Sequence, residues 1–252
     1  RHPVRQSFVA AVPASVILLA TVVTMLAGPS VLARTIWGLG AASQLAMTVW
    51  LLSRWLWTPG RGGFQWAGIT PVLFIAVVGN VLVPLAGVPL GMAEWSAAQL
   101  GVGLLWWPVV LTLLVVRIGQ QGLWPERLLP ATFIALSPPA VIGVALLQMG
   151  APPSVAWAMW GMGLFFLAWS ASVFKRIIAQ PFGLGFWGMS FPLAAYAALG
   201  LRLAESASPA FLMLSMALLA LATIAITGLV AGTVQGLRRG TLLIPDPVPP
   251  AT

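Results

Sequence analysis

The sequence predicts an all-α integral membrane protein made of repeated helical hairpins, and three observations support this prediction. Of its 252 residues, 60% are hydrophobic and 6% are charged, whereas a soluble domain carries about 25% charged residues. Apolar segments long enough to cross a bilayer follow one another along the whole chain. Internal prolines recur in alternate segments, which indicates two kinds of helix.

Eight apolar segments reach the roughly 20 residues that a membrane-crossing helix needs. They lie at 7–27, 31–53, 69–90, 95–117, 128–149, 153–174, 184–203 and 209–236. Short polar or Gly/Pro-rich turns separate them, and no stretch has the composition of a separate soluble domain. We therefore predict a single transmembrane domain over residues 1–244 and a Pro-rich, disordered cytoplasmic tail at 245–252.

The basic residues predict the orientation. If the N-terminus is cytoplasmic and the segments alternate, the outside receives only Arg34 and Arg202. The inside receives ten basic residues: Arg1, Arg5, Arg54, Arg61, Arg117, Arg127, Lys175, Arg176, Arg238 and Arg239. This bias follows the positive-inside rule. The net charge of +8 therefore indicates a multi-pass protein with both termini in the cytoplasm, and we expect no nucleic-acid partner.

Prolines mark every second segment. The first, third, fifth and seventh segments contain Pro13, Pro71 (with Pro84 further on), Pro138–Pro139 and Pro192, at intervals of 54 to 67 residues. A proline removes one backbone hydrogen bond and bends a helix. The repeat therefore predicts hairpins of one kinked and one straighter helix, with the kinked helices around a central pore lined by Pro13, Pro71, Pro138 and Pro192. The alternative is that prolines are simply common in membrane helices.

Few groups in this chain can support chemistry. The four acidic residues (Glu94, Glu126, Glu205 and Asp246) fall in predicted loops or the tail, His2 is the one histidine, and there is no cysteine. Enzymes need catalytic or metal-binding groups, and proton-coupled transporters usually place an ionisable group within the membrane. We therefore expect no enzyme, metal site or cofactor, and favour a passive pathway. A non-conducting scaffold is the other possibility, although bends destabilise helices unless something compensates.

The candidate pore residues have ordinary alternatives. The polar candidates are Ser7, Ser15, Thr70, Asn80, Ser137 and Ser190, but such residues more often form hydrogen bonds between helices. Phe191 either packs against a neighbouring helix, which is the commoner fate, or closes a narrow apolar pore by steric block and dewetting. Arg34 and Arg202 would attract anions to the outer mouth, whereas carbonyls freed by prolines would repel them. The residues alone favour anions only slightly.

Four stretches carry a resemblance to a known family. They are HPVRQSF at 2–8, TP and VVGNVLVPLAG within 70–87, ALSPP at 135–139 and FWGMSFPLAAYA at 186–197. In this order they resemble the tellurite-resistance/C4-dicarboxylate transporter family, which includes TehA-like bacterial channels and the plant slow-type guard-cell anion channels. The resemblance implies ten helices in five hairpins around a pore, a homotrimer with one pore per protomer, and a phenylalanine gate that matches Phe191. It also implies a bacterial inner-membrane location.

The resemblance also defines the functional expectation. The start at HPVRQSF matches the family's third helix, so four of five hairpins are present, and the chain begins with Arg1 rather than Met. We expect either a fragment or a truncated member. The predicted function is an anion channel or facilitator for small anions such as chloride, nitrate or small carboxylates. The alternative is a proton-coupled exporter of a C4-dicarboxylate, sulfite or a tellurium oxyanion.

Overall fold

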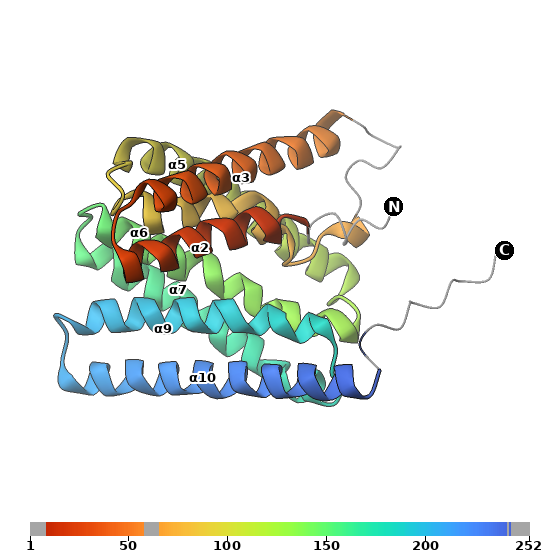
Figure 1. Ribbon diagram of the computed structural model, residues 1–252. Coiled ribbons are helices and arrows are strands. Elements are labelled where there is room, and N and C mark those ends of the chain that lie inside the picture. Colours follow the sequence, from red (N-terminus) through yellow and green to blue (C-terminus); the bar gives the residue numbers. More distant parts are fainter. Residues whose placement is uncertain (1–8, 58–65, 241, 243–252) are drawn as a thin grey trace.

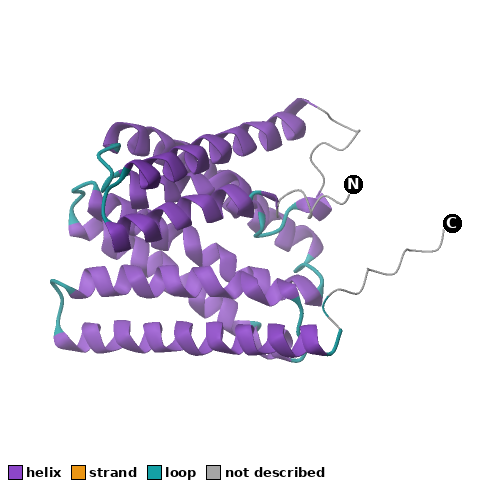
Figure 2. Ribbon diagram, in the orientation of Figure 1, coloured by secondary structure: helices purple, strands orange, loops and turns teal. Residues whose placement is uncertain are grey.

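Four helical hairpins lie side by side, with their turns at one end of the molecule (Figure 1). The computed structural model describes residues 9–57, 66–240 and 242, and every regular element in these ranges is a helix (Figure 2). The first hairpin pairs α2 (Ala11–Ala27) with α3 (Val31–Trp57), and the last pairs α9 (Ser190–Ala204) with α10 (Pro209–Arg238). This confirms the predicted all-α class.

In the second, third and fourth hairpins, the first helix is built from segments of different helix type. In the second hairpin, the 3₁₀ turn η1 (Trp66–Gly68) precedes a π-helix η2 (Phe74–Val78), a 3₁₀-helix η3 (Gly79–Leu82) and α4 (Val83–Gly87), and α5 (Ala93–Gln121) returns. In the third, the 3₁₀-helix η4 (Glu126–Leu136) continues into α6 (Ser137–Gln148), and α7 (Pro153–Ser172) returns. The short α8 (Phe174–Ile178) then leads to the 3₁₀-helix η5 (Leu184–Met189), which continues into α9.

Six helical stretches in the described ranges are long and apolar enough to cross a membrane. They are Val31–Trp55, Ala93–Gln121, Glu126–Gln148, Pro153–Ser172, Leu184–Ala204 and Pro209–Arg238. The other two predicted segments, 7–27 and 69–90, correspond to the shorter apolar helices Ala11–Ala27 and Phe74–Gly87. The count therefore differs from the predicted eight full-length spans, because residues 7 and 8 lie outside the described residues and the second stretch ends at the Gly87 turn.

Burial marks one inner helix clearly. In the most apolar part of Glu126–Gln148, 83% of the residues are buried, against 22% in Pro153–Ser172 and 11% in Pro209–Arg238. The stretches Leu184–Ala204 and Val31–Trp55 are both 39% buried, so the contacts between helices, and not burial, distinguish α9 from the outer helix α3. The inner helices form a row: α2 packs on η3 and α4, α6 packs on η3 and α4 from the other side, and α9 packs on α6. The ends of this row, α2 and α9, are not among the closely packed pairs of the described chain. The predicted division into inner and outer helices is confirmed.

The prolines lie where an α-helix begins. Pro84, Pro138 and Pro192 fall in the first turns of α4, α6 and α9, and Pro13 falls in the first turn of α2. A proline is tolerated there, because first-turn N–H groups have no acceptor within the helix. In three of the four inner helices, the expected kink is therefore a change from 3₁₀ to α geometry. Pro71 lies in the turn before η2, so Pro84 is the true counterpart of the other three prolines.

Candidate functional site

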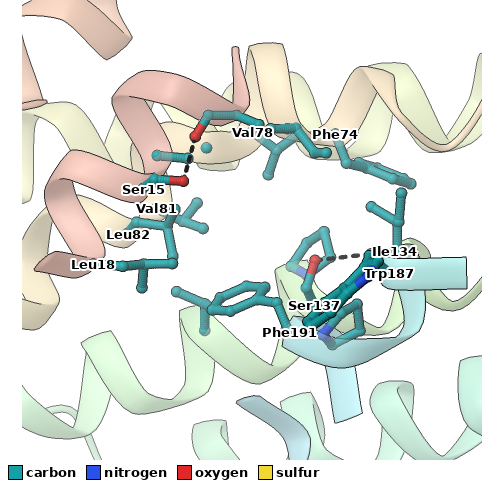
Figure 3. Close-up of a pocket in the computed structure, with 18 of the residues that line it drawn as sticks. Ser15, Leu18, Phe74, Val78, Val81, Leu82, Ile134, Ser137, Trp187 and Phe191 are labelled. Carbon is teal, nitrogen blue, oxygen red and sulfur yellow. Dashed lines mark hydrogen bonds between the residues drawn. The ribbon is translucent and has the colours of Figure 1, made fainter. Parts of the chain in front are cut away.

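A cavity of about 480 Å³ lies between the four inner helices (Figure 3). Leu18 of α2, Phe74 and Leu82 of the η2–η3 segment, Ile134 of η4 and Phe191 of α9 come from four different hairpins and meet around it. None of the described residues that line the cavity is charged. The row of inner helices therefore encloses an apolar space where the sequence predicts a pore.

The structure brings five predicted candidate residues to this cavity. They are Phe191, Pro138, Pro192, Ser15 and Ser137, and Phe191 is half-buried. In Figure 3 the Phe191 ring lies at the edge of the open space, between Leu18 and Ser137. Pro13 and Pro71 are buried, but they are not among the lining residues.

The polar groups of the cavity wall already have hydrogen-bond partners. The Ser15 hydroxyl donates to the Ala11 carbonyl at 2.7 Å, and the Ser137 hydroxyl donates to the Ile134 carbonyl at 2.8 Å. The same Ile134 carbonyl also accepts the backbone N–H of Ser137 at the end of the 3₁₀-helix. The Trp187 Nε1 donates to Thr233 Oγ1 at 2.9 Å. The wall therefore presents mainly apolar groups.

Asn80 faces away from the cavity. Its Nδ2 donates to Thr48 Oγ1 at 2.8 Å and to the Val77 carbonyl at 3.1 Å, and its Oδ1 accepts from Gln99 Nε2 at 2.9 Å. Asn80 is thus a satisfied amide between helices, which was the favoured alternative. Thr70 and Ser190 do not line the cavity either, and Ser7 lies outside the described residues.

Sequence reasoning missed the residues that surround Asn80. Gln44, Thr48 and Gln99 are 0%, 1% and 2% exposed. The sequence did carry a signal for them: Gln44 and Gln99 are long polar side chains within the predicted spans 31–53 and 95–117. A buried amide needs hydrogen-bond partners, so these two residues could have been expected to bind Asn80. It also missed Trp187, which lies one turn before Phe191 and lines the same cavity.

Charge differs between the two ends of the described bundle. The turn end carries Arg34 and Arg202 together with Glu94 and Glu205, so its charges balance. The opposite end carries seven basic residues and one acid, Glu126; the basic residues are Arg54, Arg117, Arg127, Lys175, Arg176, Arg238 and Arg239. Arg202 pairs with Glu205 at 3.4 Å. At the other end, Arg176 donates a hydrogen bond to the Glu126 carboxylate, which raises the pKa of Arg176.

Neither predicted outer-mouth arginine lies at the main cavity. Arg34 is exposed in the first turns of α3. Arg202 is exposed beside a separate cavity of about 320 Å³, which Gln148 and Glu205 also line. Because Glu205 neutralises Arg202 in this pair, the seven basic residues of the opposite end are the larger source of positive potential.

Comparison with known proteins agrees with this architecture. Residues 1–234 match the model of the SLAC1 family, described as voltage-dependent anion channel. The chain is also 24% identical over 244 residues to the S-type anion channel SLAH2 of Arabidopsis thaliana, and the match covers 93% of this chain and 45% of that protein. Proline-bounded inner helices, an uncharged cavity between them and a family match over almost the whole chain lead to one conclusion: this multi-pass membrane protein belongs to the SLAC1 family of voltage-dependent anion channels.

Proposed function

We propose that this protein passes small anions by diffusion through the cavity between its inner helices, and that Phe191 is the gate. The main support is the position of Phe191: a large apolar ring lines an uncharged cavity to which all four inner helices contribute. A narrow apolar passage excludes water and ions even when it is not fully blocked. A ring that rotates away would therefore switch conduction.

Diffusion is favoured over proton coupling by the composition of the cavity wall. Coupled transporters use ionisable groups within the membrane to bind and release protons. The described lining residues include no Asp, Glu, Lys, Arg or His. A proton-coupled exporter of a C4-dicarboxylate, sulfite or a tellurium oxyanion therefore remains the second candidate.

Charge supports anions and an orientation. The seven basic residues at the end opposite the turns would raise the local anion concentration there. Under the positive-inside rule this end is cytoplasmic, and both α2 and α10 then have their cytoplasmic ends there. We therefore propose both termini in the cytoplasm, in a bacterial inner membrane.

The assembled channel requires a closed ring of inner helices. The row described here is open between α2 and α9, and we propose that the fifth hairpin implied by the family resemblance lies in this gap. We also propose the homotrimer that the same resemblance implies. Native mass spectrometry of the full-length gene product in detergent tests the trimer, and a monomer or dimer would contradict it.

The gate is tested by Phe191→Ala. We expect chloride efflux from proteoliposomes to rise at least about tenfold, because the substitution removes a large apolar ring from the cavity wall. The matched control is Phe165→Ala on α7, because Phe165 is 65% exposed and outside the cavity lining. Unchanged efflux in folded Phe191→Ala would overturn the gate. Efflux that requires a pH gradient in both wild type and variant would favour the coupled exporter.

A further inference from the structure

The second inner helix, residues 74–87, is not α-helical in the part that forms the cavity wall. Residues 74–78 form a π-helix and residues 79–82 a 3₁₀-helix. Phe74, Val78, Val81 and Leu82 from this stretch line the cavity. A change of helix type displaces carbonyls from their usual partners four residues later, so the displaced carbonyls need other donors in a buried position.

Side chains from the outer helix α3 supply these donors. Gln44 Nε2 donates to the Ile75 and Ala76 carbonyls at 3.1 and 3.3 Å. Thr48 Oγ1 lies 2.8 Å from the same Ala76 carbonyl and 2.9 Å from the Gln44 carbonyl of its own helix, and its single proton is shared between these two acceptors. Trp37 Nε1 donates to the Val83 carbonyl at 2.9 Å. The Ile75 and Ala76 carbonyls therefore point outward to α3, away from the cavity.

A second outer helix locks the same segment. Gln99 of α5 donates from Nε2 both to Asn80 Oδ1 at 2.9 Å and to the Ala41 carbonyl of α3 at 2.8 Å. Its Oε1 accepts from Trp95 Nε1 at 2.9 Å. The four side chains Gln44, Thr48, Asn80 and Gln99, which we call the amide network, thus connect α3, the wall segment and α5.

The backbone fits closely around the amide network. A Cβ atom on Gly79 would lie 2.6 Å from Gln44 Nε2, and one on Gly103 would lie 2.4 Å from Val81 Cγ1. Both distances are shorter than a nonbonded contact allows. A side chain at position 79 would displace the Gln44 amide from its hydrogen bonds, and one at position 103 would push α5 away from the wall. These contacts fix the rotation of the wall segment about its own axis.

We propose that the amide network is a positioning element for the anion pathway: it holds residues 74–82 so that side chains face the cavity and carbonyl oxygens face the outer helices. Carbonyl oxygens carry partial negative charge, and rings of them favour cations. Turning them outward and neutralising them with N–H and O–H donors removes this preference from the wall. The effect on selectivity rests on the proposed anion function, whereas the positioning does not.

Cysteine accessibility tests the positioning, because the chain has no native cysteine. Ile75 lines the cavity and is partly exposed, whereas Ala76 is 0% exposed and does not line it. A small water-soluble thiol reagent should therefore modify Ile75→Cys much faster than Ala76→Cys. A rotation of the wall by one residue, about 100°, would bring position 76 towards the cavity in place of position 75.

Thr48→Val is the decisive variant, since valine has the shape of threonine but no hydroxyl. We expect the ratio of the two modification rates to fall about tenfold, and the chloride-to-sodium permeability ratio of the full-length protein to fall about threefold to tenfold, as the loss of one or two hydrogen bonds implies. Thr35→Val is the control on the same helix, because the exposed Thr35 hydroxyl bonds only to the Val31 carbonyl at 2.9 Å.

Two further variants keep the test decisive if Thr48→Val does not fold. Gln44→Met keeps the side-chain length without the donors and should also reduce the rate ratio, whereas Thr48→Ser should preserve it. A rate ratio that stays at the wild-type value in folded Thr48→Val or Gln44→Met would overturn the proposal. If the ratio falls but wild type does not prefer chloride over sodium, the positioning stands and the proposed anion function fails.

Discussion

Trp187 and Phe191 lie one turn apart on the same wall, but different forces hold their rings. The Trp187 indole donates a hydrogen bond to Thr233 Oγ1 at 2.9 Å, and that hydroxyl in turn donates to the Leu229 carbonyl at 2.8 Å. The Phe191 ring has no polar atom and is held by packing alone. One ring is therefore tied to the outer helix α10 by a hydrogen bond, whereas the proposed gate requires that the other ring change rotamer.

Thr233→Val tests whether the fixed ring contributes to closure. Valine preserves shape but removes the acceptor, so the Trp187 ring would gain rotamer freedom. We expect chloride efflux from proteoliposomes to rise about twofold to fivefold, the effect of losing one exposed hydrogen bond, and thus less than in Phe191→Ala. Thr227→Val on the same helix is the control, because the exposed Thr227 bonds only within its own helix. Equal efflux in Thr233→Val and Thr227→Val would show that the position of the Trp187 ring does not affect closure.

At the level of elements, the sequence predicted which segments are helices better than which kind of helix they form. The apolar runs gave the order of the spans, because the length of a run is a property of the sequence alone. The π and 3₁₀ geometry of residues 74–82 is accompanied instead by hydrogen bonds from Gln44 and Thr48, which lie 28 to 32 residues earlier in the chain. No local pattern in the sequence records those contacts.

The same limit applies to the site. Pro138 and Pro192 belong to the recurring prolines, so the sequence pointed to them directly. For Phe191 the residues alone favoured ordinary packing, and the family resemblance favoured the gate. Leu18, Phe74 and Leu82 are ordinary apolar residues in apolar helices, and only the packing of four hairpins brings them to one cavity. The gating role of Phe191 stays a prediction until conduction is measured.

The packing of α7 against α9 depends on one glycine. A Cβ atom on Gly163 would lie 2.5 Å from Tyr196 Cε2, and Tyr196 is 1% exposed, with its hydroxyl donating to the Trp160 carbonyl at 3.1 Å. Gly163→Ala should therefore destabilise the protein by about 1–3 kcal/mol, the usual cost of overpacking, and lower the midpoint of thermal unfolding in detergent.

A neighbouring glycine provides the control for this prediction. Gly161 is on the same helix, but it is exposed and a Cβ atom there would meet nothing within 4 Å. Gly161→Ala should leave the midpoint unchanged or raise it, because alanine favours a helix by about 1 kcal/mol over glycine. Equal midpoints for the two variants would show that α7 moves away from α9 at little cost.

At the scale of the whole molecule, the two ends of the bundle differ in charge, so its orientation in the membrane matters for function. The hairpin turns gather at one end with balanced charges, and seven basic residues gather at the other. Anions that approach from the basic end would be concentrated there before they reach the apolar cavity. The direction of the molecule in the membrane therefore determines which side of the cell supplies the anion to the attractive end.

Orientation can be measured directly with single cysteines, since the chain contains none. Ser206 is exposed in the turn between α9 and α10, and Ala179 is exposed at the end of α8, on the opposite side of the bundle. If the basic end is cytoplasmic, a membrane-impermeant maleimide should label Ser206→Cys in intact cells and Ala179→Cys only after permeabilisation. The Ser206 substitution exchanges an oxygen for a sulfur, so folding should not change. Labelling in the reverse pattern would place the turns in the cytoplasm, and the basic residues would then attract anions from outside the cell.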